Sequence, residues 1–330
     1  IDFEDNKGQR RRALEQALPG ALQGKTRDVA ATVAAFRDLP PDAAWSAPAK
    51  PPLPLDKPAL TITPIDPSWP LLSKAEVSPE GNKAVREALG LDPAQPVNVI
   101  LLFLESVRAY ELLHPDLGPQ IFPGLRRVLD AHGIFFSQTY SSALTAGQTA
   151  RGEFATMCSS LSNIGGAAEY VAHPGLRAHC LQETLRAAGY RTLWFNAFAK
   201  SFHNMVLFNS IHGTESFFDE SYYLAHGVTE RLGKWGLADK PVLEETLAAL
   251  EGIRREGKPF VANVLTMSTH HPHTVIPQGP LPPALVQATA KIPEYQAYLS
   301  RLRYADTAVG NFFDRFFAGP LAASTVVVLL

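Results

Sequence analysis

Apolar residues follow a repeating pattern over the last two thirds of the chain. From residue 98 onward, short runs of consecutive apolar residues alternate with longer segments of helical character. Continuous apolar runs of strand length are typical of strands that are buried on both faces. The alternation therefore predicts the α/β class, a three-layer sandwich with a mostly parallel central sheet covered by helices.

The expected elements follow one another in regular order. Strands are expected at residues 98–104, 134–140, 190–196, 260–267 and 325–330. Helices are expected at residues 122–132, 149–161, 181–188, 241–256 and 295–317. The helices at 181–188 and 241–256 stop just before a glycine, which is a favoured helix end.

The part of the chain before this pattern has a different character. Residues 5–38 predict two short amphipathic helices, and the proline-dense stretch at 40–58 favours extended geometry. We expect a helical, proline-rich juxtamembrane segment over residues 1–75 and a catalytic domain over residues 76–330. No apolar stretch reaches the roughly 18 residues that cross a bilayer. Because the chain begins with Ile1, any membrane anchor is expected outside it.

Composition and charge exclude several classes of protein. The formal net charge is −2 and the only basic run is residues 10–12, so no nucleic-acid partner is expected. A hydrophobic content of 46% with 19% charged residues is that of a globular protein rather than a disordered one. The two cysteines, Cys158 and Cys180, fit no zinc spacing. They are compatible with one disulfide or with two buried thiols.

Candidate site residues come directly after the expected strands. Ligands of open α/β sheets bind beyond the carboxyl ends of the strands, which selects Glu105, His203 and residues 268–271. A carboxylate at the position of Glu105 is costly to bury unless it is paired or binds a metal, and it could equally be an exposed strand-end acid. His270 begins the densest histidine cluster, which could contact substrate, bind a metal or form an exposed turn.

Thr149 follows a loop of small residues and opens an expected helix. Its hydroxyl would lie at the positive end of that helix, where backbone N–H groups can hold a phosphate. A threonine hydroxyl needs a base or a metal to become a nucleophile. The same position also suits a plain helix cap.

Six segments in this order and spacing resemble those of one known family. They are Asn98-Val-Ile-Leu-Leu-Phe-Leu-Glu-Ser106, Gly147-Gln-Thr-Ala-Arg-Gly-Glu-Phe154, Gly213-Thr-Glu-Ser-Phe-Phe-Asp219, Trp235-Gly-Leu-Ala-Asp239, Thr266-Met-Ser-Thr-His270 and Arg303-Tyr-Ala-Asp-Thr-Ala-Val-Gly-Asn-Phe-Phe-Asp314. The chain thereby resembles the phosphoglycerol transferases related to lipoteichoic acid synthase, within the alkaline phosphatase and sulfatase superfamily.

The resemblance implies roles for individual residues. Glu105 would be a metal ligand, Thr149 both nucleophile and metal ligand, and His270 a contact of the glycerol-phosphate group. The family's Gly-Asp-His-Gly motif follows its last apolar strand, so the Asp-His ligands are expected beyond Leu330. The implied metal is Mn²⁺, with Zn²⁺ and Mg²⁺ as further possibilities.

The sequence also departs from the family pattern. The substrate pocket of the lipoteichoic acid synthases carries Phe-Trp-Asn-Arg, where this chain has a histidine at 203 and a methionine at 205. Methionine cannot bind phosphate as arginine does, so the head group or acceptor is expected to differ. Gln148 precedes the nucleophile where some relatives have lysine. His203 remains a candidate substrate contact.

The resemblance implies a metal-dependent transfer of phosphoglycerol from a membrane glycerophospholipid to a glycan or polyol hydroxyl, through a phospho-threonine intermediate. The expected place is the inner membrane, with the catalytic domain in the periplasm. A phosphoethanolamine transferase is one alternative. A sulfatase-like hydrolase is another, although residues 150–153 lack the proline and arginine of the formylglycine signature. An inactive binding or sensor domain of the same fold is a rival from a different class.

Overall fold

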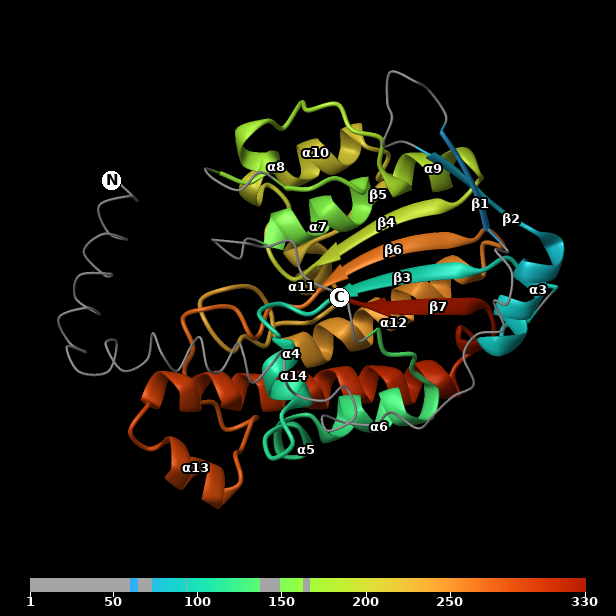
Figure 1. Ribbon diagram of the computed structural model, residues 1–330. Helices are drawn as coiled ribbons and strands as arrows, with labels where there is room; N and C mark the ends of the chain where they lie inside the picture. Colours follow the sequence, from blue (N-terminus) through green and yellow to red (C-terminus); the bar gives the residue numbers. More distant parts are fainter. Residues whose placement is uncertain (1–59, 65–72, 93, 137–148, 163–166) are drawn as a thin grey trace. The chain divides into compact units, whose positions relative to one another are not determined.

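The structure is a computed structural model that describes residues 60–64, 73–92, 94–136, 149–162 and 167–330 (Figure 1). Everything described belongs to one compact unit within residues 47–330. The two helices expected at 5–38 and the proline-dense stretch at 40–58 lie outside the described residues. The expected boundary near residue 75 therefore stays a prediction.

The centre of the domain is a five-stranded parallel sheet (Figure 1). Its strands lie in the order β5 (Ser216–Phe218), β4 (Arg191–Asn196), β6 (Phe260–Leu265), β3 (Asn98–Phe103) and β7 (Thr325–Leu329). In the register of the sheet, Leu101 of β3 lies between Asn263 of β6 and Val328 of β7. This arrangement confirms the α/β fold with a parallel central sheet that the alternating pattern predicts.

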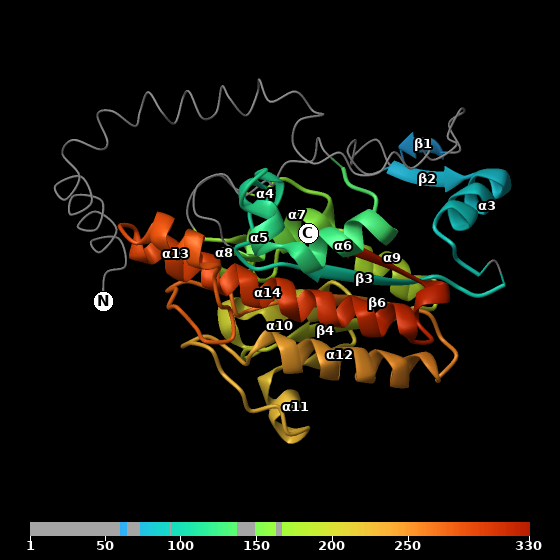
Figure 2. The ribbon, with the colours of Figure 1, turned by 90° about the horizontal axis from the view of Figure 1, so that it is seen from below.

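Helices cover both faces of this sheet (Figures 1 and 2). Side chains of β4 alternate between the faces: Leu193 and Phe195 join one apolar cluster, and Trp194 joins another. The first cluster includes helices α12 (Asp239–Arg254), α14 (Pro293–Ala318) and α6 (Pro123–His132). The second includes α7 (Thr149–Cys158), α8 (Glu169–Ala172) and α10 (Met205–Ile211). The apolar strand runs are therefore buried from two sides.

The remaining elements are short and connect these layers. Strands β1 (Leu60–Pro64) and β2 (Ser73–Val77) form an antiparallel pair. The other helices are α3 (Pro79–Ala88), α4 (Ala109–Leu113), α5 (Gly118–Ile121), α9 (Leu181–Ala187), α11 (Glu220–Ala225) and α13 (Pro283–Thr289), with 3₁₀ turns η1 (Phe202–Asn204) and η2 (Ala322–Ser324).

One expected strand differs from the structure. The sequence predicts a strand over residues 134–140, yet residues 134–136 are not in a strand, and residues 137–140 lie outside the described part. Ile134 and Phe136 are 40% and 70% exposed. A short apolar run forms a buried strand only where other elements cover its side chains, and here Ile134 and Phe136 face solvent.

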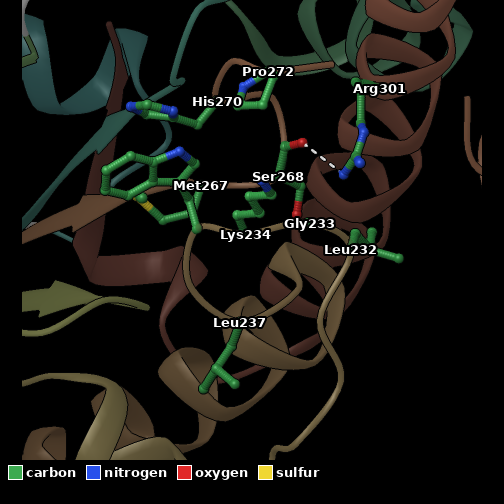
Figure 3. A pocket seen from close by; sticks show the side chains of 10 residues that line it. Leu232, Gly233, Lys234, Leu237, Met267, Ser268, His270, Pro272 and Arg301 are labelled. Carbon is green, nitrogen blue, oxygen red and sulfur yellow. Dashed lines mark hydrogen bonds between the residues drawn. The ribbon is translucent and has the colours of Figure 1, made fainter. Parts of the chain in front are cut away.

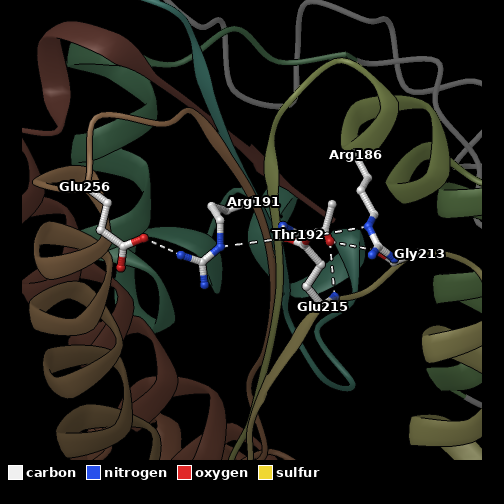
Figure 4. A network of polar contacts seen from close by, with 6 residues as sticks. All are labelled: Arg186, Arg191, Thr192, Gly213, Glu215 and Glu256. Carbon is white, nitrogen blue, oxygen red and sulfur yellow. Dashed lines mark hydrogen bonds and ion pairs between the residues drawn. The ribbon is translucent and has the colours of Figure 1, made fainter.

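Charged side chains fix the amino end of β4, away from the carboxyl ends where ligands are expected (Figure 4). The Arg191 guanidinium forms ion pairs with Glu256 and, at 3.7 Å, with Glu215. Arg186 of α9 contacts the same Glu215 carboxylate at 3.4 Å. The Thr192 backbone N–H also donates to Glu215, at 3.2 Å. This network links β4 to neighbouring segments and has a structural role.

The two cysteines form a disulfide. Cys158 is the last residue of α7, and Cys180 directly precedes α9. Of the two possibilities left by the sequence, the structure selects the cross-link. The disulfide covalently links α7, the helix that begins at Thr149, to the segment that leads into α9 and β4.

Candidate active site

The structure brings Glu105 and Thr149 into direct contact at the carboxyl edge of the sheet. Glu105 follows β3, and Thr149 is the first residue of α7. The Thr149 hydroxyl donates a hydrogen bond of 2.6 Å to Oε2 of Glu105, across 44 positions of sequence. The Glu105 residue is only 8% exposed. Two residues selected by separate sequence arguments therefore form one pair, although this contact does not test their roles.

The position of Glu105 is fixed from several directions. Its backbone N–H donates to the Thr266 hydroxyl at 2.9 Å, and the Thr269 hydroxyl donates to its carbonyl oxygen. The Ser106 hydroxyl donates to Oε1 of Glu105 at 2.8 Å. Ser106 has a φ of +54°, and the Tyr298 hydroxyl donates to its carbonyl at 2.7 Å. Such left-handed backbone at a non-glycine residue is strained and persists where its surroundings hold it.

The loop that follows β6 is held by buried polar groups. The Asp239 carboxylate accepts hydrogen bonds from the backbone N–H groups of Met267, at 2.6 Å, and Ser268, at 3.1 Å. Burial raises the pKa of Asp239 to about 6, despite these hydrogen bonds. The guanidinium of Arg301 in α14 donates to the Ser268 carbonyl at 3.3 Å and the Thr274 carbonyl at 3.0 Å. These contacts orient the segment that carries His270.

His203 and His270 belong to one continuous row of rings. The Trp235 ring lies 4.8 Å from that of His270 and 5.6 Å from that of Phe202, measured between centroids. The His203 ring stacks on Phe202 at 3.8 Å. His203 has a φ of +54°, and partial burial lowers its pKa. The structure therefore brings the two candidate substrate contacts to the same wall, from segments that follow different strands.

A small, partly open hollow lies beside this row of rings (Figure 3). Trp235 and His270 form part of its lining, and Lys234 and Arg301 contribute the positive charges. Ser268 also lines it. The sequence argument selected the histidine but neither of the two cations, because neither directly follows a strand.

Glu153 is a second buried acid near the nucleophile candidate that the sequence argument did not single out. It lies in α7 four positions after Thr149, and residues at this spacing share one face of a helix. It has no exposed surface, and among the described residues neither carboxylate oxygen has a hydrogen-bond partner. Burial raises its pKa to about 8, and the nearby Glu105 charge adds to the shift. The sequence feature that could have indicated this buried acid is that Glu153 is the one acidic residue of the helix segment 149–158.

The described residues contain only part of a metal centre. No group of three or more His, Cys, Asp or Glu side chains among them could hold a metal ion. Glu105 and Thr149 together offer carboxylate and hydroxyl oxygens, and no basic side chain in the described ranges forms an ion pair with Glu105. In the same ranges, no helix has the length and apolar content needed to span a membrane.

Comparisons with known proteins agree with this fold. Residues 97–330 match the family described as Sulfatase. Phosphoglycerol transferase I of Xanthomonas campestris pv. campestris is 26% identical over 250 residues, which are 72% of this chain and 34% of that protein. The chain thus spans about a third of the length of the curated relatives that it matches.

Two solved structures have the same fold. The lipoteichoic acid synthase LtaP from Listeria monocytogenes superposes with a TM-score of 0.62 and 22% identity, over 73% of this chain and 57% of that one. A protein in the alkaline phosphatase superfamily from Vibrio parahaemolyticus gives a TM-score of 0.60 and 19% identity, over 85% of this chain and 58% of that one.

Proposed function

We propose, since the chain belongs to the sulfatase family, that it transfers a phosphoglycerol group from a membrane glycerophospholipid to an acceptor hydroxyl, with Thr149 as the nucleophile. The observation that carries this proposal is the hydrogen bond of 2.6 Å from the Thr149 hydroxyl to the buried Glu105 carboxylate. It places a hydroxyl, an acid and a helix amino end at one point of the sheet edge, where ligands of such folds bind.

The reaction would proceed in two steps. The Thr149 oxygen forms a bond to the phosphorus of the donor, while the bond from phosphorus to the diacylglycerol oxygen breaks. As this bond forms, the threonine loses the hydroxyl proton that it donates to Oε2 of Glu105. The leaving diacylglycerol oxygen takes up one proton, so the step is balanced. In the second step the acceptor oxygen forms a bond to the phosphorus while the bond from phosphorus to the Thr149 oxygen breaks, and the acceptor's proton returns to the threonine oxygen. The acceptor would be a glycan or a polyol.

Glu105 and Thr149 would also hold a divalent cation. The fit rests on a carboxylate that is 8% exposed and has no cationic partner in the described residues, since a buried charge without a partner is costly. The cation would lower the pKa of the hydroxyl and neutralise charge on the phosphate oxygens. Oxygen donors suit Mn²⁺ or Mg²⁺, with Zn²⁺ as the remaining candidate. An Asp-His pair beyond Leu330 stays the prediction for the other ligands.

His270 and His203 would contact the substrate, because both belong to the ring row at the same edge. Access to a lipid head group requires a site at a membrane surface. We therefore place the catalytic domain in the periplasm, at the inner membrane. No nucleic-acid partner is proposed.

The test measures diacylglycerol release from phosphatidylglycerol vesicles by a form of the protein that extends past Leu330, with Mn²⁺ present. Thr149→Ala should lower the rate by about 10³-fold or more, as removal of a nucleophile does. Thr307→Ala, at an exposed position of α14, should leave it unchanged.

Mass spectrometry of quenched reactions should find phosphoglycerol on the Thr149 peptide. Full activity of Thr149→Ala would refute the assignment, and faster turnover of phosphatidylethanolamine would favour the phosphoethanolamine alternative.

A further inference from the structure

The hollow beside His270 contains two positive charges, and no carboxylate of the described residues forms an ion pair with them. Lys234 is exposed and forms no ion pair with any described residue. Arg301 is 2% exposed, and among the described residues its guanidinium donates to carbonyl and hydroxyl oxygens of residues 268 and 274. Figure 3 shows both side chains around the same hollow, from two different segments.

The two cations lie on adjoining parts of the wall. A Cβ atom built on Gly233 would lie 3.5 Å from a terminal nitrogen of Arg301. The backbone that carries Lys234 therefore passes directly over the guanidinium. Both side chains bring positive charge to the lining of one hollow, and a negatively charged group is attracted to such a site. The structure thus favours an anion in this hollow.

The nearest acid does not supply that negative group. Asp239 lies close enough to influence Arg301 electrostatically, which partly offsets the burial of the guanidinium. However, its carboxylate oxygens already accept hydrogen bonds from the backbone N–H groups of Met267 and Ser268. Asp239 is also 1% exposed, so it cannot reach the exposed ammonium of Lys234 in the open part of the hollow.

The segment after β4 supplies no cation to this wall. Met205 is 4% exposed and packs in the apolar cluster with Trp194 and Phe208. Its side chain therefore belongs to the apolar interior and is not part of the lining of the hollow. The only positive groups in the lining of the described hollow come from the loop before α12 and from α14.

We propose that Lys234, with Arg301 behind it, binds a phosphate group of the substrate in the hollow beside His270. The Trp235 ring, 4.8 Å from that of His270, would pack against the carbon atoms attached to this phosphate. Lys234 is then a specificity-determining residue. It supplies its positive charge from the loop before α12, whereas position 205, in the segment after β4, carries an uncharged methionine. This inference rests on the proposed phosphoglycerol transfer, because that reaction supplies the phosphate. The phosphate is either that of the donor phosphodiester or one already carried by the acceptor.

The first experiment measures binding alone, by calorimetry with glycerol phosphate and with inorganic phosphate as probes. Lys234→Met should weaken glycerol phosphate binding about tenfold, as expected for loss of one charge-assisted hydrogen bond, and Lys234→Arg should restore it. Lys258→Met is the matched control, because this exposed lysine precedes β6 at the opposite edge of the sheet. Because Lys234 is exposed, its replacement should not disturb folding. Equal affinity of Lys234→Met and the parent protein would overturn the inference.

The second experiment identifies the source of the phosphate. With water as the acceptor, a raised KM for phosphatidylglycerol and a nearly unchanged kcat in Lys234→Met would assign the donor phosphate. A raised KM only for an acceptor that already carries phosphoglycerol would assign the acceptor phosphate. Unchanged KM values in both arms would refute a substrate role for Lys234 while leaving phosphoglycerol transfer intact. Conversely, Lys234-dependent probe binding in a protein that releases no diacylglycerol would support the site and refute the proposed reaction.

Discussion

Replacing Glu153 by glutamine should stabilise the protein at pH 8 and change its stability little at pH 5. The side chain has no exposed surface, and burial raises its pKa from 4.5 to about 8. In the unfolded chain the carboxyl would lose its proton near its ordinary value of 4.5. Between these two values the folded protein holds a proton that the unfolded protein releases, so a rise in pH favours unfolding.

The magnitude follows from the width of this window. One pH unit corresponds to about 1.4 kcal/mol, so the penalty should grow by about 4 kcal/mol between pH 5 and pH 8. Glutamine has nearly the shape of a protonated glutamic acid and carries no charge, so its variant lacks this penalty. The two proteins should therefore diverge in stability as the pH rises, with the variant the more stable.

Urea unfolding of both proteins at pH 5, 6, 7 and 8, in the presence of a chelator, would measure this divergence. Fluorescence of the buried Trp194 provides the signal. All other titrating groups are shared, so they cancel in the difference between the two proteins. Glu294→Gln, at an exposed position, is the control and should give a flat difference. A flat difference for Glu153→Gln would show that this carboxyl does not keep its proton, and would refute the reasoning.

Two further predictions concern cross-links within the fold. Replacing both Cys158 and Cys180 by serine removes a bridge across 22 positions and should lower the free energy of unfolding by about 3 kcal/mol, measured by urea unfolding without reductant. An unchanged unfolding midpoint would contradict this. Asp306→Ala removes the acceptor for two backbone N–H groups at the start of α6, at 2.7 and 2.9 Å, and should cost about 2 to 3 kcal/mol. The exposed Asp314→Ala is its control, and equal losses in the two variants would refute the capping role.

The sheet could be predicted from the sequence because its strands are buried on both faces. The run that precedes Glu105 contains no polar interruption, and its length matches a strand. The carboxyl-end rule then located Glu105 and His270 without knowledge of the strand order. The order itself, with β3 between β6 and β7, could not be derived, since an apolar run does not specify its neighbours.

Residues whose roles depend on distant partners escaped prediction. Arg301 lies within a long helix, where an arginine usually faces solvent, and only the packing of α14 against the 268–274 loop buries it. The disulfide needed the relative placement of α7 and α9, which spacing alone does not give. The helix at Met205–Ile211 was missed because two residues with positive φ, His203 and Asn204, precede it and no ordinary capping signal marks its start.

The place of β3 in the sheet has a consequence for biosynthesis. Asn98 of β3 pairs beside Thr325 of β7, across 227 positions of sequence. At about 5 to 20 residues per second, the ribosome needs on the order of 10 to 45 s to make the intervening chain. Throughout that time one edge of this highly apolar strand lacks its partner.

An unpaired apolar strand edge is a template for aggregation. Contacts between such distant segments also slow folding, because a long loop must close before they form. The nascent chain should therefore depend on chaperones until β7 has been synthesised, and nascent chains stalled before residue 325 should be more sensitive to proteases than those that include β7.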